Sequence, residues 1–152
     1  MGDMTISKIL LPLIISLGLI GCGQKDTKNV EKGSSDPTLC SFLDNSCTKS
    51  TKGVNFTIKI SPEEVPSEQD LHFRLTVDKT VINVKARLEG RDMFMGIIPV
   101  VLSQTESNTY DSQFMLGSCA SGYMVWRLFI SAEYQGQQIN THFDFLADNK
   151  QK

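Results

Sequence analysis

Apolar and polar residues alternate along most of the chain after Val54. In the first such run, residues 54–60, every second side chain is apolar and polar side chains stand between them. Successive side chains of a strand point to opposite faces, so this alternation predicts strands that bury one face. The pattern, or a dense apolar run, recurs in seven segments: residues 54–60, 71–77, 82–88, 97–102, 110–116, 123–134 and 138–146.

Turn-forming residues separate these segments. Pro62 and Pro66 cannot donate to a strand ladder, and Gly136 lies between the last two segments. Pro99 places the fourth strand at a sheet edge or at a bulge. Seven short strands within about a hundred residues, with no amphipathic helical stretch, predict an all-β, immunoglobulin-like antiparallel β-sandwich over residues 54–148. A small Greek-key barrel is the alternative.

A different pattern precedes the strands. Lys8 is followed by an uncharged, Ile- and Leu-rich run over residues 9–20, which ends in Leu19-Ile20-Gly21-Cys22. A membrane-crossing helix needs roughly 20 apolar residues, whereas the core of an export signal has about 7 to 15 and ends in small residues. We therefore interpret residues 1–21 as a cleaved signal peptide.

The chain resembles bacterial lipoproteins at Leu19-Ile20-Gly21-Cys22. The resemblance implies cleavage before Cys22, diacylglycerol on its sulfur and an acylated new N-terminus. Several acyl chains on one residue hold a protein at a bilayer firmly. Position 23 is Gly rather than Asp, which in enterobacterial-type sorting favours the outer membrane, with the domain facing the periplasm. The alternative is a secretory signal with a chance cysteine.

A polar segment follows the predicted anchor. Residues 23–35 are mainly charged residues, Gly and Ser, with Val30 as the one sizeable apolar side chain. Such a segment buries too little surface to offset the entropy lost on ordering, so it is expected to be a flexible tether. We assign residues 22–53 to the lipidated tether and the segment of Cys40 and Cys47. The remaining chain has the length of one domain.

Three cysteines remain after lipidation. Cys40 and Cys47 are expected to form a disulfide, because an exported protein meets oxidising conditions and a loop of this length closes easily. Pairing of Cys119 with either of them is the alternative.

The formal charge of −2 does not change on cleavage, which removes one Lys and one Asp. The chain has no basic stripe, so a nucleic-acid partner is not expected.

Catalytic motifs are absent from the sequence. It contains no G-x-S-x-G, C-x-x-C or H-E-x-x-H motif and no phosphate-binding Gly-rich loop. Strand alternation places His72 and His142 on outer, polar faces. We therefore expect a protein without enzymatic activity.

One group of soft ligands suggests a metal site. Met93 and Met95 are two residues apart, on one side if the chain is extended, and Cys119 lies shortly before Met124. Thiolate and thioether sulfur prefer Cu(I) over harder cations. The alternative is that these methionines fill core gaps and that Phe94 closes one end of the sandwich.

The chain also resembles the FixH/YtkA-like family of periplasmic sandwich domains, which is associated with copper handling and oxidase assembly. The residues that carry this resemblance are Met93-Phe94-Met95-Gly96, the strand of residues 110–114 and Met124-Val125-Trp126-Arg127-Leu128. It implies a role in copper handling, in which Met93, Met95, Cys119 and Met124 would be the soft ligands of Cu(I). No histidine stands beside the Met-x-Met-Gly segment.

Two functional hypotheses follow. The first is a lipid-anchored, non-enzymatic module of the cell envelope that binds another, unidentified envelope protein through a sheet face or an edge strand. The second is a periplasmic Cu(I)-binding protein that assists metal delivery to a membrane oxidase. No other cofactor is expected.

Overall fold

The computed structural model describes residues 36–43, 46–120 and 124–148, so the predicted lipidation site Cys22 lies outside the described residues. Within these ranges the chain forms ten strands and no helix. No helix long and apolar enough to cross a membrane occurs in this part of the chain. The strands are β1 (Leu39–Cys40), β2 (Cys47–Thr51), β3 (Val54–Ser61), β4 (Asp70–Val77), β5 (Ile82–Gly90), β6 (Ile97–Val100), β7 (Ser103–Glu106), β8 (Thr109–Met115), β9 (Met124–Tyr134) and β10 (Gln137–Ala147).

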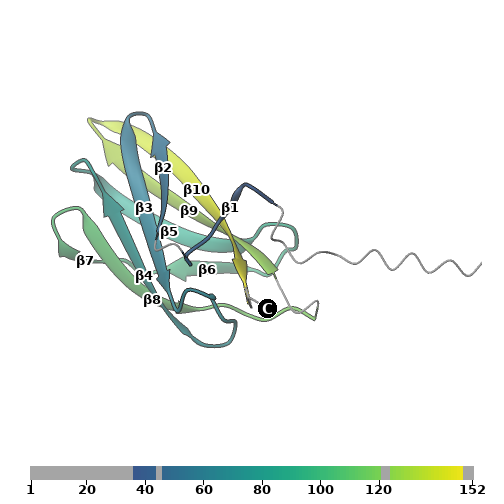
Figure 1. Ribbon diagram of the computed structural model, residues 1–152. Helices are drawn as coiled ribbons and strands as arrows, with labels where there is room; N and C mark the ends of the chain where they lie inside the picture. Colours follow the sequence, from purple (N-terminus) through teal and green to yellow (C-terminus); the bar gives the residue numbers. More distant parts are fainter. Residues whose placement is uncertain (1–35, 44–45, 121–123, 149–152) are drawn as a thin grey trace, which may run out of the picture.

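The strands form two sheets of five strands each, which pack face to face (Figure 1). Sheet A has the order β1-β10-β9-β5-β6, and sheet B has the order β2-β3-β4-β8-β7. All strand pairs are antiparallel except β1 and β10, which are parallel. The all-β sandwich predicted from the sequence is therefore confirmed, and the barrel alternative is not realised.

The strand order matches the immunoglobulin-like arrangement. In sheet B, β3, β4, β8 and β7 occupy the positions of strands A, B, E and D. In sheet A, β5, β9 and β10 occupy those of strands C, F and G. The chain therefore crosses between the sheets after β1, after β4, after β6 and after β8.

The seven predicted strands are β3, β4, β5, β6, β8, β9 and β10. β1, β2 and β7 are additional. β1 has only two residues, and β2 and β7 carry no run of alternating apolar residues. None of these three strands could therefore be predicted from apolar alternation. Because β1 and β2 belong to the sheets, the sheets begin at Leu39 and not at Val54. β6 lies at an edge, as Pro99 predicts.

The core lies between the two sheets and follows the alternation. Every second residue of β3 from Val54 to Ile60, and of β4 from Leu71 to Val77, is buried. Trp126 is the largest of the fully buried side chains, as expected for a core residue. Each large apolar side chain buried in this way stabilises the fold by about 1.5–3 kcal/mol.

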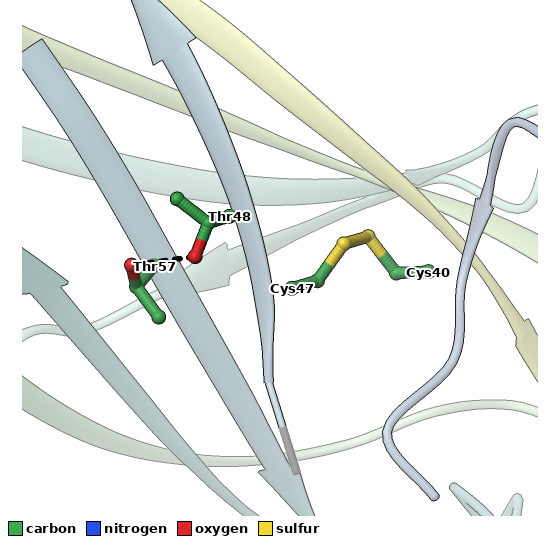
Figure 2. The surroundings of a disulfide bond; sticks show 4 residues. All are labelled: Cys40, Cys47, Thr48 and Thr57. Carbon is green, nitrogen blue, oxygen red and sulfur yellow. Dashed lines mark hydrogen bonds between the residues drawn. A yellow bond between two sulfur atoms is a disulfide. The ribbon is translucent and has the colours of Figure 1, made fainter. Parts of the chain in front are cut away.

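A disulfide joins the two sheets near the start of the described chain. Cys40 in β1 of sheet A pairs with Cys47 in β2 of sheet B, with their Cα atoms 5.7 Å apart (Figure 2). Next to the disulfide, the hydroxyls of Thr48 in β2 and Thr57 in β3 are hydrogen-bonded at 2.8 Å. The predicted Cys40–Cys47 pair is thus present, and pairing of either with Cys119 is excluded.

Candidate functional site

The predicted metal ligands gather at one end of the sandwich. At this end β5 ends at Gly90, β6 and β9 begin, and Asp36 precedes β1; we call it the Asp36 end. The loop of residues 91–96 joins β5 to β6, and residues 116–120 continue from β8. The β9–β10 turn of Gln135 and Gly136 lies at the opposite end of the molecule (Figure 1).

Gly90 allows the β5–β6 loop to fold over the start of β9. A Cβ atom built on Gly90 would lie 2.1 Å from the carbonyl oxygen of Met93 and 2.3 Å from Met124 Cε. Both distances are too short for any side chain. The missing side chain at Gly90 therefore lets the Met93 backbone and the Met124 side chain occupy the same corner.

The three methionines of the predicted site have different environments. Met93 is 54% exposed, Met95 is partly buried against the core, and Met124 is a core residue with 6% exposure. The prediction that Met93 and Met95 lie on one side of an extended chain is wrong, because both belong to the loop that precedes β6. Strand alternation does not apply there.

Cys119 lies on the segment that follows β8 and is partly buried against the same core. The Met95 side chain approaches this segment, since its Cε would lie 3.9 Å from a Cβ built on Gly117. The fold therefore brings Met95 to the segment of Cys119 and the Met93 backbone to Met124. The four residues lie at the Asp36 end, but Met124 is a core residue and Met93 is largely in solvent.

The same loop carries an apolar surface that the sequence did not predict. Phe94 is 85% exposed and Ile97, at the start of β6, is 60% exposed. The expectation that Phe94 closes one end of the sandwich is wrong, because its side chain points into solvent. The one signal in the sequence is Gly96 itself, two residues after Phe94, because glycine favours loops; in the structure it has a positive φ of 79°.

Charged residues fix the base of this loop. Arg91 binds Asp36 through Nη1 at 2.8 Å and Asp92 through Nε at 2.9 Å. Hydrogen bonds from Thr38 and from Arg91 lower the pKa of Asp36 to about 2. Arg91 also lies 3.8 Å from Asp144, so the loop is attached both to the segment before β1 and to β10.

Asp144 is the only buried carboxylate among the described residues. Arg127 on the neighbouring strand donates two hydrogen bonds to it, at 2.7 and 2.8 Å. Burial raises the pKa of Asp144, but the hydrogen bond and charge of Arg127, with His142 and Arg91, outweigh it and hold this pKa below its ordinary value. The carboxylate therefore stays ionised and binds the ends of β9 and β10 together.

A groove on the outer face of sheet B is the second candidate site. Its volume is about 610 Å³, and it crosses β3, β4, β8 and the start of β7. Sequence analysis did not predict it, because its residues come from four strands whose neighbours become known only with the register. The lining residues are Lys59, Ser61, His72, Phe73, Arg74, Val101, Ser103, Asp111, Ser112 and Gln113.

Paired side chains order the floor of this groove. Arg74 donates two hydrogen bonds to Asp111, at 2.7 and 3.0 Å, and lowers the pKa of that carboxyl. The His72 ring lies 3.0 Å from the Gln113 amide. Lys59 stands opposite Arg74 in the strand register. Since Asp111 neutralises Arg74, Lys59 supplies the groove's remaining positive charge among its described lining residues.

The two histidines lie far apart in the fold. His72 is exposed on the outer face of sheet B, and His142 is exposed on the outer face of sheet A, beside the Phe129 ring. Their predicted position on outer faces is confirmed. Among the described residues, no three His, Cys, Asp or Glu side chains are close enough to hold a metal ion together.

Comparisons with known proteins do not assign the chain to a family. No family model and no curated protein matches the chain. A solved structure similar to part of it is that of a DUF4785 family protein from Legionella pneumophila, with 18% identity and a TM-score of 0.46. The match covers 60% of this chain and 28% of that protein.

Proposed function

We propose that this chain is a lipid-anchored, non-enzymatic module that binds another protein of the bacterial cell envelope. The anchor is Cys22 of the Leu19-Ile20-Gly21-Cys22 motif, and the folded domain faces the periplasm. Gly23, in place of Asp, favours sorting to the outer membrane. The Cys40–Cys47 disulfide is consistent with an oxidising compartment. The signal motif, the tether and the disulfide thus support one location.

The observation that carries the binding role is the groove on the outer face of sheet B. It is open and has both polar and apolar lining residues, and it combines the cation of Lys59 with hydrogen-bonding groups on His72 and Gln113. The Arg74–Asp111 pair and the His72–Gln113 pair order the floor of the groove. A partner segment that presents carboxylates and backbone carbonyls would complement this surface.

The arrangement of reactive side chains supports binding over catalysis. Acid–base or nucleophilic catalysis requires a base within hydrogen-bond reach of a nucleophile or of a reacting group. In the described part of the chain, His72 binds the Gln113 amide and His142 lies on the other sheet. Ser61 stands opposite His72 in the strand register, but among the described residues no hydrogen bond joins the two side chains.

The first experiment tests the anchor. Cells expressing the full chain are labelled with palmitate, and the wild-type protein is compared with Cys22→Ala. We expect label and membrane fractionation for the wild type and neither for the variant. An unlabelled wild-type protein would overturn the anchored module.

The second experiment tests the groove. A photo-crosslinking amino acid is placed at His72 or Gln113 in the full chain, and at Asn140 on the outer face of sheet A as a control. We expect one discrete crosslinked envelope protein from both groove positions and not from Asn140. Equal crosslinking from the two faces would contradict a binding role of the groove.

Periplasmic Cu(I) binding for delivery to a membrane oxidase is a second candidate function. It is favoured by the approach of the Met95 side chain to the segment of Cys119. Thiolate and thioether sulfur are soft ligands suited to Cu(I). Since Met124 is a core residue, Met93, Met95 and Cys119 are the ligands that could bind without opening the sandwich.

A Cu(I) competition titration tests this candidate. Stoichiometric binding should be lost in Cys119→Ser and kept in Met124→Leu, which fills a similar volume in the core. Absence of binding by the wild type would overturn it.

A further inference from the structure

We infer that the β5–β6 loop contacts the lipid bilayer to which the chain is anchored, with Phe94 inserted among the lipid acyl chains. This inference rests on the proposed lipid anchor. It assigns the exposed apolar surface of residues 93–97 to a lipid surface and gives the domain a defined orientation at the membrane.

The first argument is the exposure of this loop. Phe94 is 85% exposed, Ile97 60% and Met93 54%, and the three lie within five consecutive residues. Single exposed apolar residues are common, but an aromatic side chain with two apolar neighbours at a loop tip forms a local patch. An aromatic ring and a flexible thioether both suit the apolar side of a membrane interface.

The second argument is where the tether joins the domain. The described chain begins at Asp36, and Arg91 at the base of the loop binds Asp36 at 2.8 Å. Thirteen residues separate Cys22 from Asp36, and they reach at most about 45 Å when fully extended. The lipid anchor therefore keeps the Asp36 end within about 45 Å of the bilayer, so the loop beside this attachment point is among the parts of the domain held nearest to lipid.

The charges around the loop define the kind of contact. Asp92 is bound to Arg91, so the loop base carries a paired charge. Glu64, Glu68 and Asp70 are exposed at the same end, on the side of sheet B. The contact is therefore apolar and not electrostatic, and zwitterionic lipid is the suitable probe. A weak contact is sufficient, because the anchor already holds the loop at a high effective concentration of lipid.

Tryptophan quenching by brominated lipid tests the inference. The lipidated full chain is reconstituted in vesicles of phosphatidylcholine brominated on its acyl chains, as Phe94→Trp and as Ile82→Trp. Ile82 is 57% exposed at the start of β5, at the opposite end of the sandwich, so it is a matched control. The native Trp126 is fully buried and provides the common background.

We expect bromine to reduce the emission of Phe94→Trp several-fold more than that of Ile82→Trp. Equal quenching of the two variants, on protein that carries lipid and floats with the vesicles, would overturn the loop contact and leave the anchor intact. A blue-shifted Phe94→Trp emission without quenching would assign the loop to a protein contact and also overturn the inference. A wild-type protein without lipid would overturn the anchor, and the inference with it.

Discussion

Arg91 and Asp36 form an ion pair, with Nη1 and Oδ2 2.8 Å apart, that attaches the β5–β6 loop to the segment before β1. The two residues are 55 positions apart in the sequence. Arg91 also donates its backbone N–H to the carbonyl of Val125 at 2.9 Å, so the loop base is bound to β9 as well. The Asp36 end is therefore held by polar contacts, while its apolar side chains remain available at the surface.

Stability should fall as the pH drops from about 4 to about 2. Asp36, Asp111 and Asp144 all have a lowered pKa in the folded chain, so the unfolded chain takes up protons first. The stabilisation is complete above the ordinary carboxyl pKa of 3.8 and is lost as the pH falls toward the folded value of about 2 for Asp36. Thermal unfolding followed by circular dichroism over this range measures the loss.

Asp144→Asn should weaken this acid dependence, because it removes one of the carboxylates responsible. At neutral pH the variant should lose about 2 kcal/mol, since the hydrogen bonds from Arg127 are no longer made to a charged acceptor. A variant with the stability and the pH profile of the wild type would contradict the assigned role of the Arg127–Asp144 pair.

Loss of the Cys40–Cys47 disulfide should lower the free energy of unfolding by about 2.5 kcal/mol, because the reduced chain regains the entropy of an open loop. Urea unfolding of Cys40→Ala/Cys47→Ala measures this loss. The wild type treated with a reductant should show the same shift, and Cys119→Ser should retain its sensitivity to the reductant. An unchanged midpoint after reduction would mean that the bridge does not stabilise the pairing of β1 with β10.

The strand content could be predicted because alternation reports burial directly. In β3 and β4 each apolar residue of the pattern is a core residue. β2 and β7 could not be predicted in this way. β2 is held at the edge of sheet B by its ladder with β3 and by the disulfide at Cys47, neither of which depends on alternating apolar side chains.

Lys59→Glu should abolish crosslinking from the groove without changing the thermal midpoint. Lys59 is exposed and stands opposite Arg74, whose charge Asp111 already neutralises, so the change reverses the charge offered to a partner. Lys85→Glu, an exposed strand position in sheet A, is the matched control and should keep the crosslink. Loss of the crosslink in both variants would indicate a general charge effect and not a specific groove.

The candidate sites show where sequence reasoning ends. The sequence groups Met93, Met95, Cys119 and Met124 by their soft chemistry, but it does not show that Met124 belongs to the core and Phe94 to the surface. Side chains in a loop do not alternate regularly between two faces. The directions of the side chains of residues 93–95 therefore depend on local contacts, such as the close approach of the Met93 carbonyl oxygen to Gly90. The groove depends on the strand register, which places Lys59 beside Arg74 and His72 beside Gln113.

Gly90→Ala should destabilise the domain by about 1 to 3 kcal/mol, the usual cost of overpacking. The added methyl group would lie 2.1 Å from the carbonyl oxygen of Met93, so the loop backbone itself must move, whereas Met124 Cε belongs to a flexible side chain. Gly117→Ala is the matched control at the same end, because its nearest neighbour, Met95 Cε, is at an ordinary contact distance of 3.9 Å. Urea unfolding should separate the two variants clearly. Equal midpoints would mean that the β5–β6 loop is not closed over Gly90 in solution, and the position of Phe94 at the Asp36 end would then lose its structural basis.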